Sequence, residues 1–180
     1  MASGDDHNFA DKSCSTGGWY TPAKVLDPIR CYFGGVIPLD PCTLPTNPTE
    51  ALEFFTPEDD GLAKPWGGYG GVFVNPPYGV KNRFHDWVSK IHEEAENGEA
   101  IIALLPCGSR FETRYWQEDI LNEFLDALCF IKGRVPFEDE TGKPHKNNTY
   151  GSLLYGFGVD VNRFTEAFWE LGRVFAVKLQ

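Results

Sequence analysis

The residues best suited to chemistry in this sequence are Asn75, Pro76, Pro77 and Tyr78, which directly follow the apolar run Gly71 to Val74. An apolar run that ends in two prolines predicts a buried strand followed by a rigid loop, because proline restricts φ and has no backbone N–H. The Asn75 side chain and the Pro76 carbonyl offer two acceptors that can converge on an exocyclic NH2 group, and the Tyr78 ring offers a face for stacking a base. This arrangement suits methylation of a conjugated amine. Proline pairs also occur in ordinary loops, so the surrounding elements must support the interpretation.

Apolar runs and amphipathic stripes alternate along the chain. We expect strands at 36–39, 72–75, 101–106, 129–131, 152–157 and 174–179, and helices at 83–95, 113–127 and 162–171. Thr21 is expected to cap a short helix and Asp27 a second turn that runs to Phe33, whereas residues 51–55 fit a strand or a short helix equally well. The alternation predicts an α/β fold with a mostly parallel sheet, helices on both faces and functional groups at the carboxyl ends of the strands.

Size and charge limit the possible functions. The 180 residues fit one domain, with residues 1–16 expected to form a disordered or loosely attached arm and residues 17–180 the single folded domain. A net charge of −10 argues against a nonspecific nucleic-acid coat, although a local basic face remains compatible with it. The basic residues near predicted loops are Lys81, Arg83, Arg110, Arg114, Lys132, Arg134, Lys143 and Lys146. They either form such a face or are scattered solvated side chains.

Several absences in the sequence exclude other classes of protein. Five cysteines with no C-x-x-C spacing support neither a disulfide framework nor a zinc site, so we expect reduced thiols and no bound metal. No apolar run is long enough to cross a bilayer and no signal-peptide core is visible, so a soluble, cytoplasmic protein is expected. Glycine-rich phosphate-binding motifs and His-Glu-x-x-His are absent, which leaves nucleotide hydrolysis and zinc chemistry without support.

A series of short motifs resembles one known family. The motifs are WYTP at 19–22, LDPC at 39–42, FFTPEDDGL at 54–62, Trp66, VFVNPPYG at 72–79, Trp87, ALLP at 103–106, KGRVPF at 132–137 and Ser152. In this order and spacing they resemble the small phage-type DNA N6-adenine methyltransferases, the Dam-like family. The resemblance implies a Rossmann-like class I fold that depends on S-adenosylmethionine, with an adenine amine in DNA as acceptor, in the cytoplasm of a phage host.

The resemblance also implies roles for individual residues. It implies Asn75, Pro76, Pro77 and Tyr78 as catalytic residues; Trp19, Tyr20, Thr21, Pro22, Asp40, Pro41, Cys42, Asp59, Asp60 and Asn75 as cofactor-binding residues; and Lys81, Arg83, Arg110, Arg114 and Arg134 as nucleic-acid-binding residues. Asp40 has an alternative role as a simple turn cap. Asp59 and Asp60 have an alternative role as solvated turn formers.

The substrate remains open within this interpretation. Hydrogen bonds accepted from both amine hydrogens would expose the nitrogen lone pair of adenine, and a base in duplex DNA would first have to be extruded. An RNA base or a protein glutamine presents a similar planar NH2 group, and a silent S-adenosylmethionine-binding regulatory module is a further alternative. The chain between Cys42 and Asn75 is too short for a separate recognition domain. Specificity is therefore expected from loops near 107–115 and 138–150, or from a second subunit.

Overall fold

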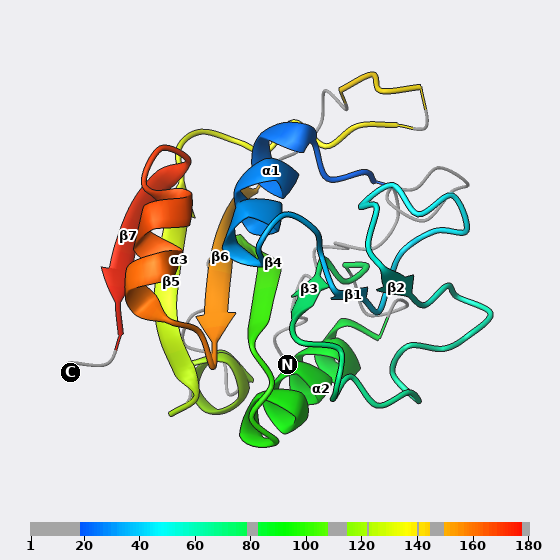
Figure 1. The fold of residues 1–180 in the computed structure, drawn as a ribbon, viewed down its shortest axis with the longest axis horizontal. Coiled ribbons are helices and arrows are strands. Elements are labelled where there is room, and N and C mark those ends of the chain that lie inside the picture. Colours follow the sequence, from blue (N-terminus) through cyan, green and yellow to red (C-terminus); the bar gives the residue numbers. More distant parts are fainter. Residues whose placement is uncertain are drawn as a thin grey trace, which may run out of the picture.

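The computed structural model describes residues 19–78, 83–107, 115–121, 123–139, 141–144 and 150–177. The expected arm at 1–16 and most of the loop at 107–115 lie outside these residues. A seven-stranded sheet with the order β2-β1-β3-β4-β6-β5-β7 runs through the molecule (Figure 1). Its strands are β1 (Leu39–Asp40), β2 (Glu53–Phe54), β3 (Val72–Val74), β4 (Ile101–Cys107), β5 (Leu125–Ile131), β6 (Gly151–Phe157) and β7 (Gly172–Ala176).

The sheet is mixed, although five of its seven strands run in the same direction. The pairs β1·β2, β1·β3 and β3·β4 are parallel, whereas β4·β6, β5·β6 and β5·β7 are antiparallel. Strands β1 to β5 therefore run in one direction, and only β6 and β7 run in the other. Half of the pairings are antiparallel, because β6 inserts between β4 and β5 and because β7 runs antiparallel to β5. The edge at which β1 to β5 end is called the carboxyl edge below.

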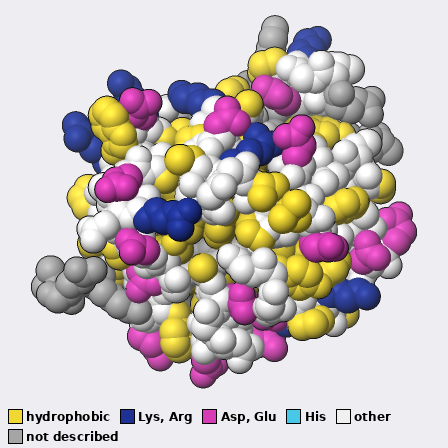
Figure 2. Space-filling view, in the orientation of Figure 1, with side chains coloured by type: hydrophobic (Ala, Val, Ile, Leu, Met, Phe, Trp, Pro, Cys, Tyr) yellow, Lys and Arg dark blue, Asp and Glu magenta, His cyan; other side chains and the backbone are white. Residues whose placement is uncertain are grey.

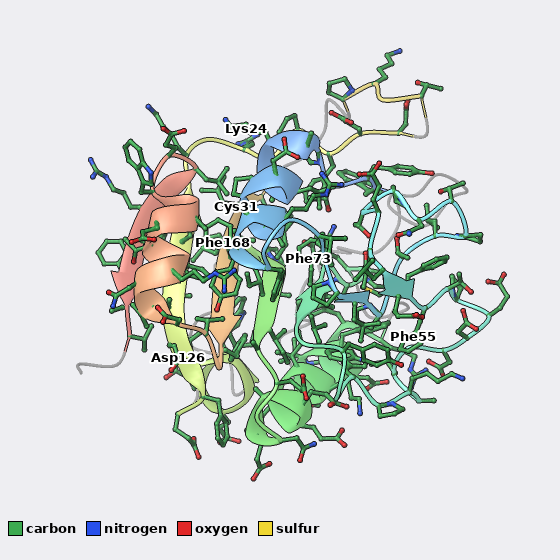
Figure 3. The ribbon with its side chains drawn as sticks, viewed as in Figure 1. Lys24, Cys31, Phe55, Phe73, Asp126 and Phe168 are labelled. Atoms are coloured by element: carbon green, nitrogen blue, oxygen red, sulfur yellow. The ribbon has the colours of Figure 1, made fainter. Side chains whose placement is uncertain are left out.

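Helices cover both faces of the sheet, as the alternating pattern predicts. Helices α1 (Ala23–Tyr32) and α3 (Val161–Phe168) lie in front of the strands in Figure 1 and share one apolar core with them. Figure 3 shows Phe73 of β3 and Phe168 of α3, which both belong to this core. Helix α2 (Phe84–Glu96) and the π-helical turn η2 (Tyr115–Ile120) pack into a second core on the other face. Two buried layers thus position the carboxyl edge from both sides.

The helix expected over 113–127 is largely wrong. Among the described residues only Tyr115–Ile120 is helical, Leu121 is exposed, and β5 already begins at Leu125. Strand β5 lies between β6 and β7, so its backbone groups pair on both sides. These tertiary hydrogen bonds override the local helical periodicity.

Other boundaries follow the sequence more closely. The start of the chain forms one helix, α1, which continues through Pro28 rather than breaking into two turns, and Thr21 makes no cap hydrogen bond. Positive φ angles at Gly34 and Gly35 end this helix, as expected. Residues 51–55 contribute strand β2. Helix α2 and strands β4 and β6 lie where they were predicted.

Four of the five cysteines lie among the described residues. Cys31, Cys42, Cys107 and Cys129 are all free thiols. Within the described ranges, no helix has both the length and the apolar character needed to span a membrane.

Candidate functional site at the carboxyl edge

The loop after β3 is held by the hydrogen bonds of Asn75. Its Nδ2 donates to Thr21 Oγ1 at 3.1 Å, and its Oδ1 accepts from the Tyr78 hydroxyl at 2.9 Å. The Tyr78 hydroxyl also lies 3.1 Å from the Leu104 carbonyl of β4. Burial raises the pKa of Tyr78, so this hydroxyl stays protonated and acts as a donor. The sequence did not predict that Tyr78 would occupy the acceptor expected to face a substrate amine.

The two prolines and the Tyr78 ring complete this loop. Pro76 is buried and Pro77 is exposed, so the loop turns from the sheet toward solvent within two residues. The Tyr78 ring contacts the edge of Phe84 at the start of α2, with ring centroids 5.8 Å apart. The ring is therefore packed against protein and is not fully exposed for stacking in this conformation.

Asp40 is a buried carboxylate at the end of β1. It is 3% exposed, and its two oxygens accept hydrogen bonds from the Thr49 hydroxyl at 2.8 Å and from the Cys42 backbone N–H at 3.1 Å. Burial raises its pKa from 3.8 to about 6, and the hydrogen bonds oppose that rise only in part. In the part of the chain that the structure describes, no lysine or arginine forms an ion pair with it. The fold therefore keeps an uncompensated acid at this edge, which is costly unless a cation arrives.

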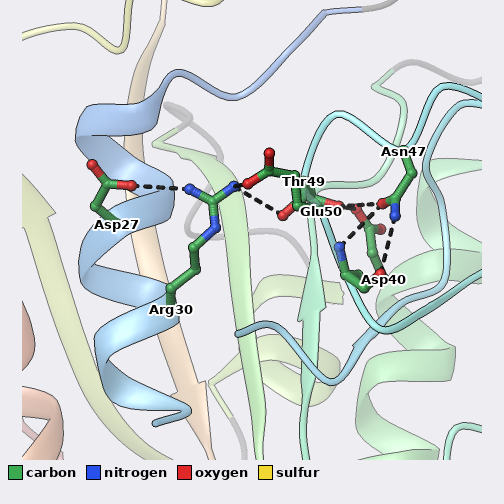
Figure 4. Close-up of polar contacts among 7 residues, drawn as sticks. Asp27, Arg30, Asp40, Asn47, Thr49 and Glu50 are labelled. Atoms are coloured by element: carbon green, nitrogen blue, oxygen red, sulfur yellow. Dashed lines mark hydrogen bonds and ion pairs between the residues drawn. The ribbon is translucent and has the colours of Figure 1, made fainter. Parts of the chain in front are cut away.

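A short loop supplies the hydroxyl that binds Asp40. Figure 4 shows Arg30 of α1 reaching this loop, where its guanidinium donates to the Thr49 carbonyl at 3.0 Å and pairs with Glu50 at 3.0 Å. The Asn47 side chain closes the same loop through hydrogen bonds to Ala51. Sequence reasoning missed Thr49, because a threonine in a polar, proline-rich loop carries no signal of its own.

Cys42 brings the end of β1 and the end of β3 together. Its thiol accepts a hydrogen bond from the Asn75 backbone. Burial and the negative charge of Asp40 raise the pKa of this thiol, so it stays protonated. The group formed by Thr21, Asp40, Cys42, Asn75 and Tyr78 is called the edge cluster below. It joins residues predicted to bind the cofactor with residues predicted to bind the acceptor amine.

The segment before α1 fixes one side of the edge cluster. The Trp19 ring contacts Phe137 at a centroid distance of 5.8 Å, and Tyr20 pairs with Glu138 through two backbone hydrogen bonds of 2.9 and 3.0 Å. Pro22 is buried and stands directly before α1. The motifs at 19–22 and 132–137 therefore lie against one another beside the loop after β3.

The two acids of the next turn have structural partners. Asp59 accepts hydrogen bonds from both the backbone N–H and the hydroxyl of Thr56, at 2.9 and 2.8 Å, and these bonds lower its pKa. Asp60 is exposed and lies 3.6 Å from Arg83. Asp59 thus acts as a turn former in this structure, as its alternative role requires.

This turn lies directly against the end of β1. A side chain at Gly61 would collide with the Pro41 carbonyl, so the close contact requires glycine. The buried Trp66 donates from its indole nitrogen to the Gly61 carbonyl at 2.9 Å. The motifs at 39–42 and 54–62 therefore form one unit, in which Asp59 bonds to Thr56 and Asp60 lies near Arg83.

The predicted DNA-binding cations differ in their settings. Arg83 is paired with Asp86 at 2.7 Å and with Asp60, whereas Arg134 is exposed just after β5 at the carboxyl edge. Lys81, Arg110 and Arg114 lie outside the described residues.

Charge differs between the two edges of the sheet. Figure 3 labels Lys24 and Asp126 toward opposite edges, and Figure 2 shows acidic side chains along the lower edge and a mixture of acidic and basic side chains higher on this face. Several described lysines and arginines lie at the carboxyl edge, namely Lys24, Lys132, Arg134, Lys143 and Arg173.

The mixed sheet with helices on both faces is consistent with a Rossmann-like methyltransferase fold. The chain belongs to the DNA N-6-adenine-methyltransferase (Dam) family, which it matches over residues 11–160. It is 30% identical to the DNA N-6-adenine-methyltransferase of Escherichia phage T1 over 149 residues, covering 76% of this chain and 60% of that relative. The chain thus spans about three fifths of the relative's length. The family predicted from the short motifs is confirmed.

The edge cluster fits the cofactor of such a family. S-adenosylmethionine carries an ammonium group and a sulfonium, and Asp40 is a buried acid with no cationic partner among the described residues. Within the same residues no group of three His, Cys, Asp or Glu side chains is placed to hold a metal. Asp40 is the residue best suited to hold a cationic ligand.

Proposed function

We propose that this protein transfers a methyl group from S-adenosylmethionine to the N6 amine of adenine in DNA. The observation that supports the proposal is that Cys42 links the ends of β1 and β3, because its thiol interacts with the Asn75 backbone and its backbone N–H donates to Asp40. An amine acceptor and a cation-binding acid then share one small site. Membership of the Dam family supports the same reaction.

Asp40 provides the cofactor side of the site. Bound there, S-adenosylmethionine supplies a methyl group made electrophilic by its sulfonium. The Asp40 carboxylate attracts the cationic methionine half, and Thr49 together with the Cys42 backbone keeps both carboxylate oxygens in place. Trp19, Tyr20, Pro22 and Pro41 would border the cofactor, whereas Asp59 and Asp60 remain candidates for its ribose or adenine.

Asn75 provides the acceptor side. Its Oδ1 and the Pro76 carbonyl would accept hydrogen bonds from the two hydrogens of the adenine N6, which exposes the nitrogen lone pair. The amine nitrogen would form a bond to the methyl carbon as the carbon–sulfur bond breaks, S-adenosylhomocysteine would leave, and the nitrogen would then lose one proton to water. Pro77 keeps the loop rigid. Positioning the two reactants in this way supplies a large part of the rate gain.

Asn75 Oδ1 has two lone pairs, so Tyr78 can share this oxygen with the amine or release it when the amine binds. Its hydroxyl retains the Leu104 carbonyl as an alternative acceptor. Extruding a base from duplex DNA costs a few kcal/mol, and stacking of the base on the Tyr78 ring would offset about 1 to 3 kcal/mol of this.

The basic face would contact DNA phosphates. Arg134 is a candidate among the described residues, because it is exposed and directly follows β5 at the carboxyl edge. Phosphate contacts release counterions, so raised salt should weaken DNA binding, and Arg134→Ala should reduce the salt dependence. An affinity independent of salt would exclude this role. The phage origin of the relative favours a host cytoplasm as the location.

The reaction is tested with cofactor labelled on its methyl group. The protein is incubated with DNA, RNA or protein, and the modified product is identified by mass spectrometry. The proposal predicts N6-methyladenine in DNA and no label with Asn75→Ala. Label only in RNA or on glutamine would establish one of the alternative substrates, and cofactor binding without any product would indicate a silent module.

A further inference from the structure

Thr21 contacts the catalytic loop from a distant part of the sequence. Its side chain is 7% exposed, and its Oγ1 lies 3.1 Å from Asn75 Nδ2. Thr21 precedes α1 and makes no cap hydrogen bond to that helix. The Thr21 hydroxyl therefore bonds to Asn75 rather than to the backbone of α1.

The proposed reaction requires a defined orientation of the Asn75 amide. Only Oδ1 can accept a hydrogen bond from an amine, so Nδ2 must point the other way and find an acceptor there. Tyr78 cannot fix this orientation alone, because its hydroxyl can bond to the Leu104 carbonyl instead and shares Oδ1 with the substrate amine. Thr21 provides the acceptor for Nδ2, and that acceptor persists after Tyr78 has moved.

We propose that Thr21 is a positioning residue that holds the Asn75 amide with its oxygen toward the substrate. The inference rests on the proposed function, and it gives Thr21 a different role from direct cofactor binding. Without this hydroxyl, the productive orientation leaves a half-buried N–H group unpaired, and the rotated amide would place an N–H donor against the amine.

The surroundings of Thr21 suit a fixed acceptor. Its neighbour Tyr20 is paired with Glu138 by two backbone hydrogen bonds, and its other neighbour Pro22 is buried at the start of α1. The backbone is thus held on both sides of the residue. A rigid support of this kind is what a positioned hydrogen bond requires.

Two substitutions separate positioning from packing. Thr21→Val keeps the shape and removes the acceptor, whereas Thr21→Ser keeps the hydroxyl and loses only a methyl group. Thr21→Val should lower kcat by about 10- to 100-fold with little change in the affinity for S-adenosylmethionine, and Thr21→Ser should recover most of the rate. Thr165→Val is the matched control, since it removes a threonine hydroxyl bonded to the Val161 carbonyl on α3. Weaker cofactor binding with unchanged kcat, or equal rates for all three variants, would overturn the proposal.

A second measurement does not depend on activity. In the free protein, the side-chain NH2 signal of Asn75 is identified by nuclear magnetic resonance from its loss in Asn75→Asp. Thr21→Val should shift this signal, and neither Thr21→Ser nor Thr165→Val should do so to the same extent. An unmoved signal in Thr21→Val contradicts the positioning role. If the signal shifts in Thr21→Val but the unmodified protein methylates no adenine, the contact between Thr21 and Asn75 is supported and the proposed function is refuted.

Discussion

Two carboxylates are buried in the part of the chain that the structure describes, and only one of these two has a counter-ion. Glu94 in α2 is 4% exposed, accepts a hydrogen bond from the Trp66 backbone at 3.2 Å and lies 2.6 Å from Lys90. Burial lowers the pKa of Lys90, but the hydrogen bond and charge of Glu94 outweigh this and raise it. Asp40 is equally buried and has only hydroxyl and N–H partners among the described residues.

This difference separates a structural acid from a functional one. A buried ion pair is complete within the fold, so its loss affects stability. Burial without a neighbouring cation raises the pKa of an acid, and a cation that binds beside the acid stabilises its ionised form. Substitutions around Glu94 should therefore lower the free energy of unfolding. Substitutions in the edge cluster should instead change ligand binding and turnover.

The largest effect is expected on the Glu94 side. Glu94→Ala leaves Lys90 and the Trp66 N–H without their buried partner, which should lower the free energy of unfolding by about 3 to 5 kcal/mol. Chemical denaturation measures this loss. Glu93→Ala is the control, because Glu93 pairs with the same lysine but is exposed, and it should cost less than about 1 kcal/mol. Equal losses of unfolding free energy in Glu94→Ala and Glu93→Ala would show that the buried ion pair contributes no more than the exposed one.

Asn75→Ala should produce the next largest effect, on turnover. Loss of one positioned acceptor should lower kcat by about 100- to 1,000-fold, while the affinity for S-adenosylmethionine changes little. Rates of methyl transfer and calorimetric titration provide the two values. Asn162→Ala on α3 is the control and should behave like the unmodified protein. Unchanged turnover in Asn75→Ala would contradict the acceptor role.

Asp40→Asn should weaken cofactor binding and remove its pH dependence. The affinity should fall by about 10- to 100-fold, because a charged partner is lost while Thr49 can still bond to the amide. In the unmodified protein, affinity should rise as the pH is raised through about 6, since only the ionised carboxylate attracts a cation. Calorimetric titration across this pH range measures both effects, with Asp126→Asn at the opposite edge as control. An Asp40→Asn protein that keeps the same pH profile would refute the assignment.

The same pKa shift has an opposite consequence for stability without cofactor. Between pH 3.8 and about 6 the folded protein retains a proton on Asp40 that the unfolded chain has released. The contribution of this group to stability therefore declines as pH rises through that window. Asp40→Asn should abolish that decline, which thermal unfolding at several pH values would detect.

Tyr78→Phe should have the smallest effect. Its hydroxyl competes with the substrate for Asn75 Oδ1, so removing it should lower KM a few-fold and leave kcat within about threefold. Tyr78→Ala is the comparison, because it also removes the stacking face and should cost about 1 to 3 kcal/mol of base binding. Steady-state kinetics distinguish the two. If both variants lose activity equally, the hydroxyl has a role beyond this contact.

The sequence predicted the parts of the site that depend on local pattern. Apolar runs followed by polar residues located Asp40 and Asn75 at strand ends, and parallel strands then had to bring them to one edge. The apolar stripe of α2 was equally readable, because one face of that helix contacts the core. Short motifs in a fixed order were enough to identify the family.

Contacts between distant segments could not be predicted in this way. Nothing local indicates that Thr49 binds Asp40 or that Thr21 binds Asn75 across 54 positions. The strand at β5 was partly missed for the same reason, since its pairing with β6 and β7 decides its conformation. Threonines in loops and strands with helical periodicity acquire their roles only from tertiary neighbours.

The most direct test of the comparison is a crystal structure of the protein with S-adenosylhomocysteine, the demethylated product of the cofactor. The account predicts its amino group within about 4 Å of the Asp40 carboxylate and its sulfur facing the Asn75 side chain. Electron density for the ligand away from the edge cluster, with no cationic group of the ligand beside the Asp40 carboxylate, would contradict it.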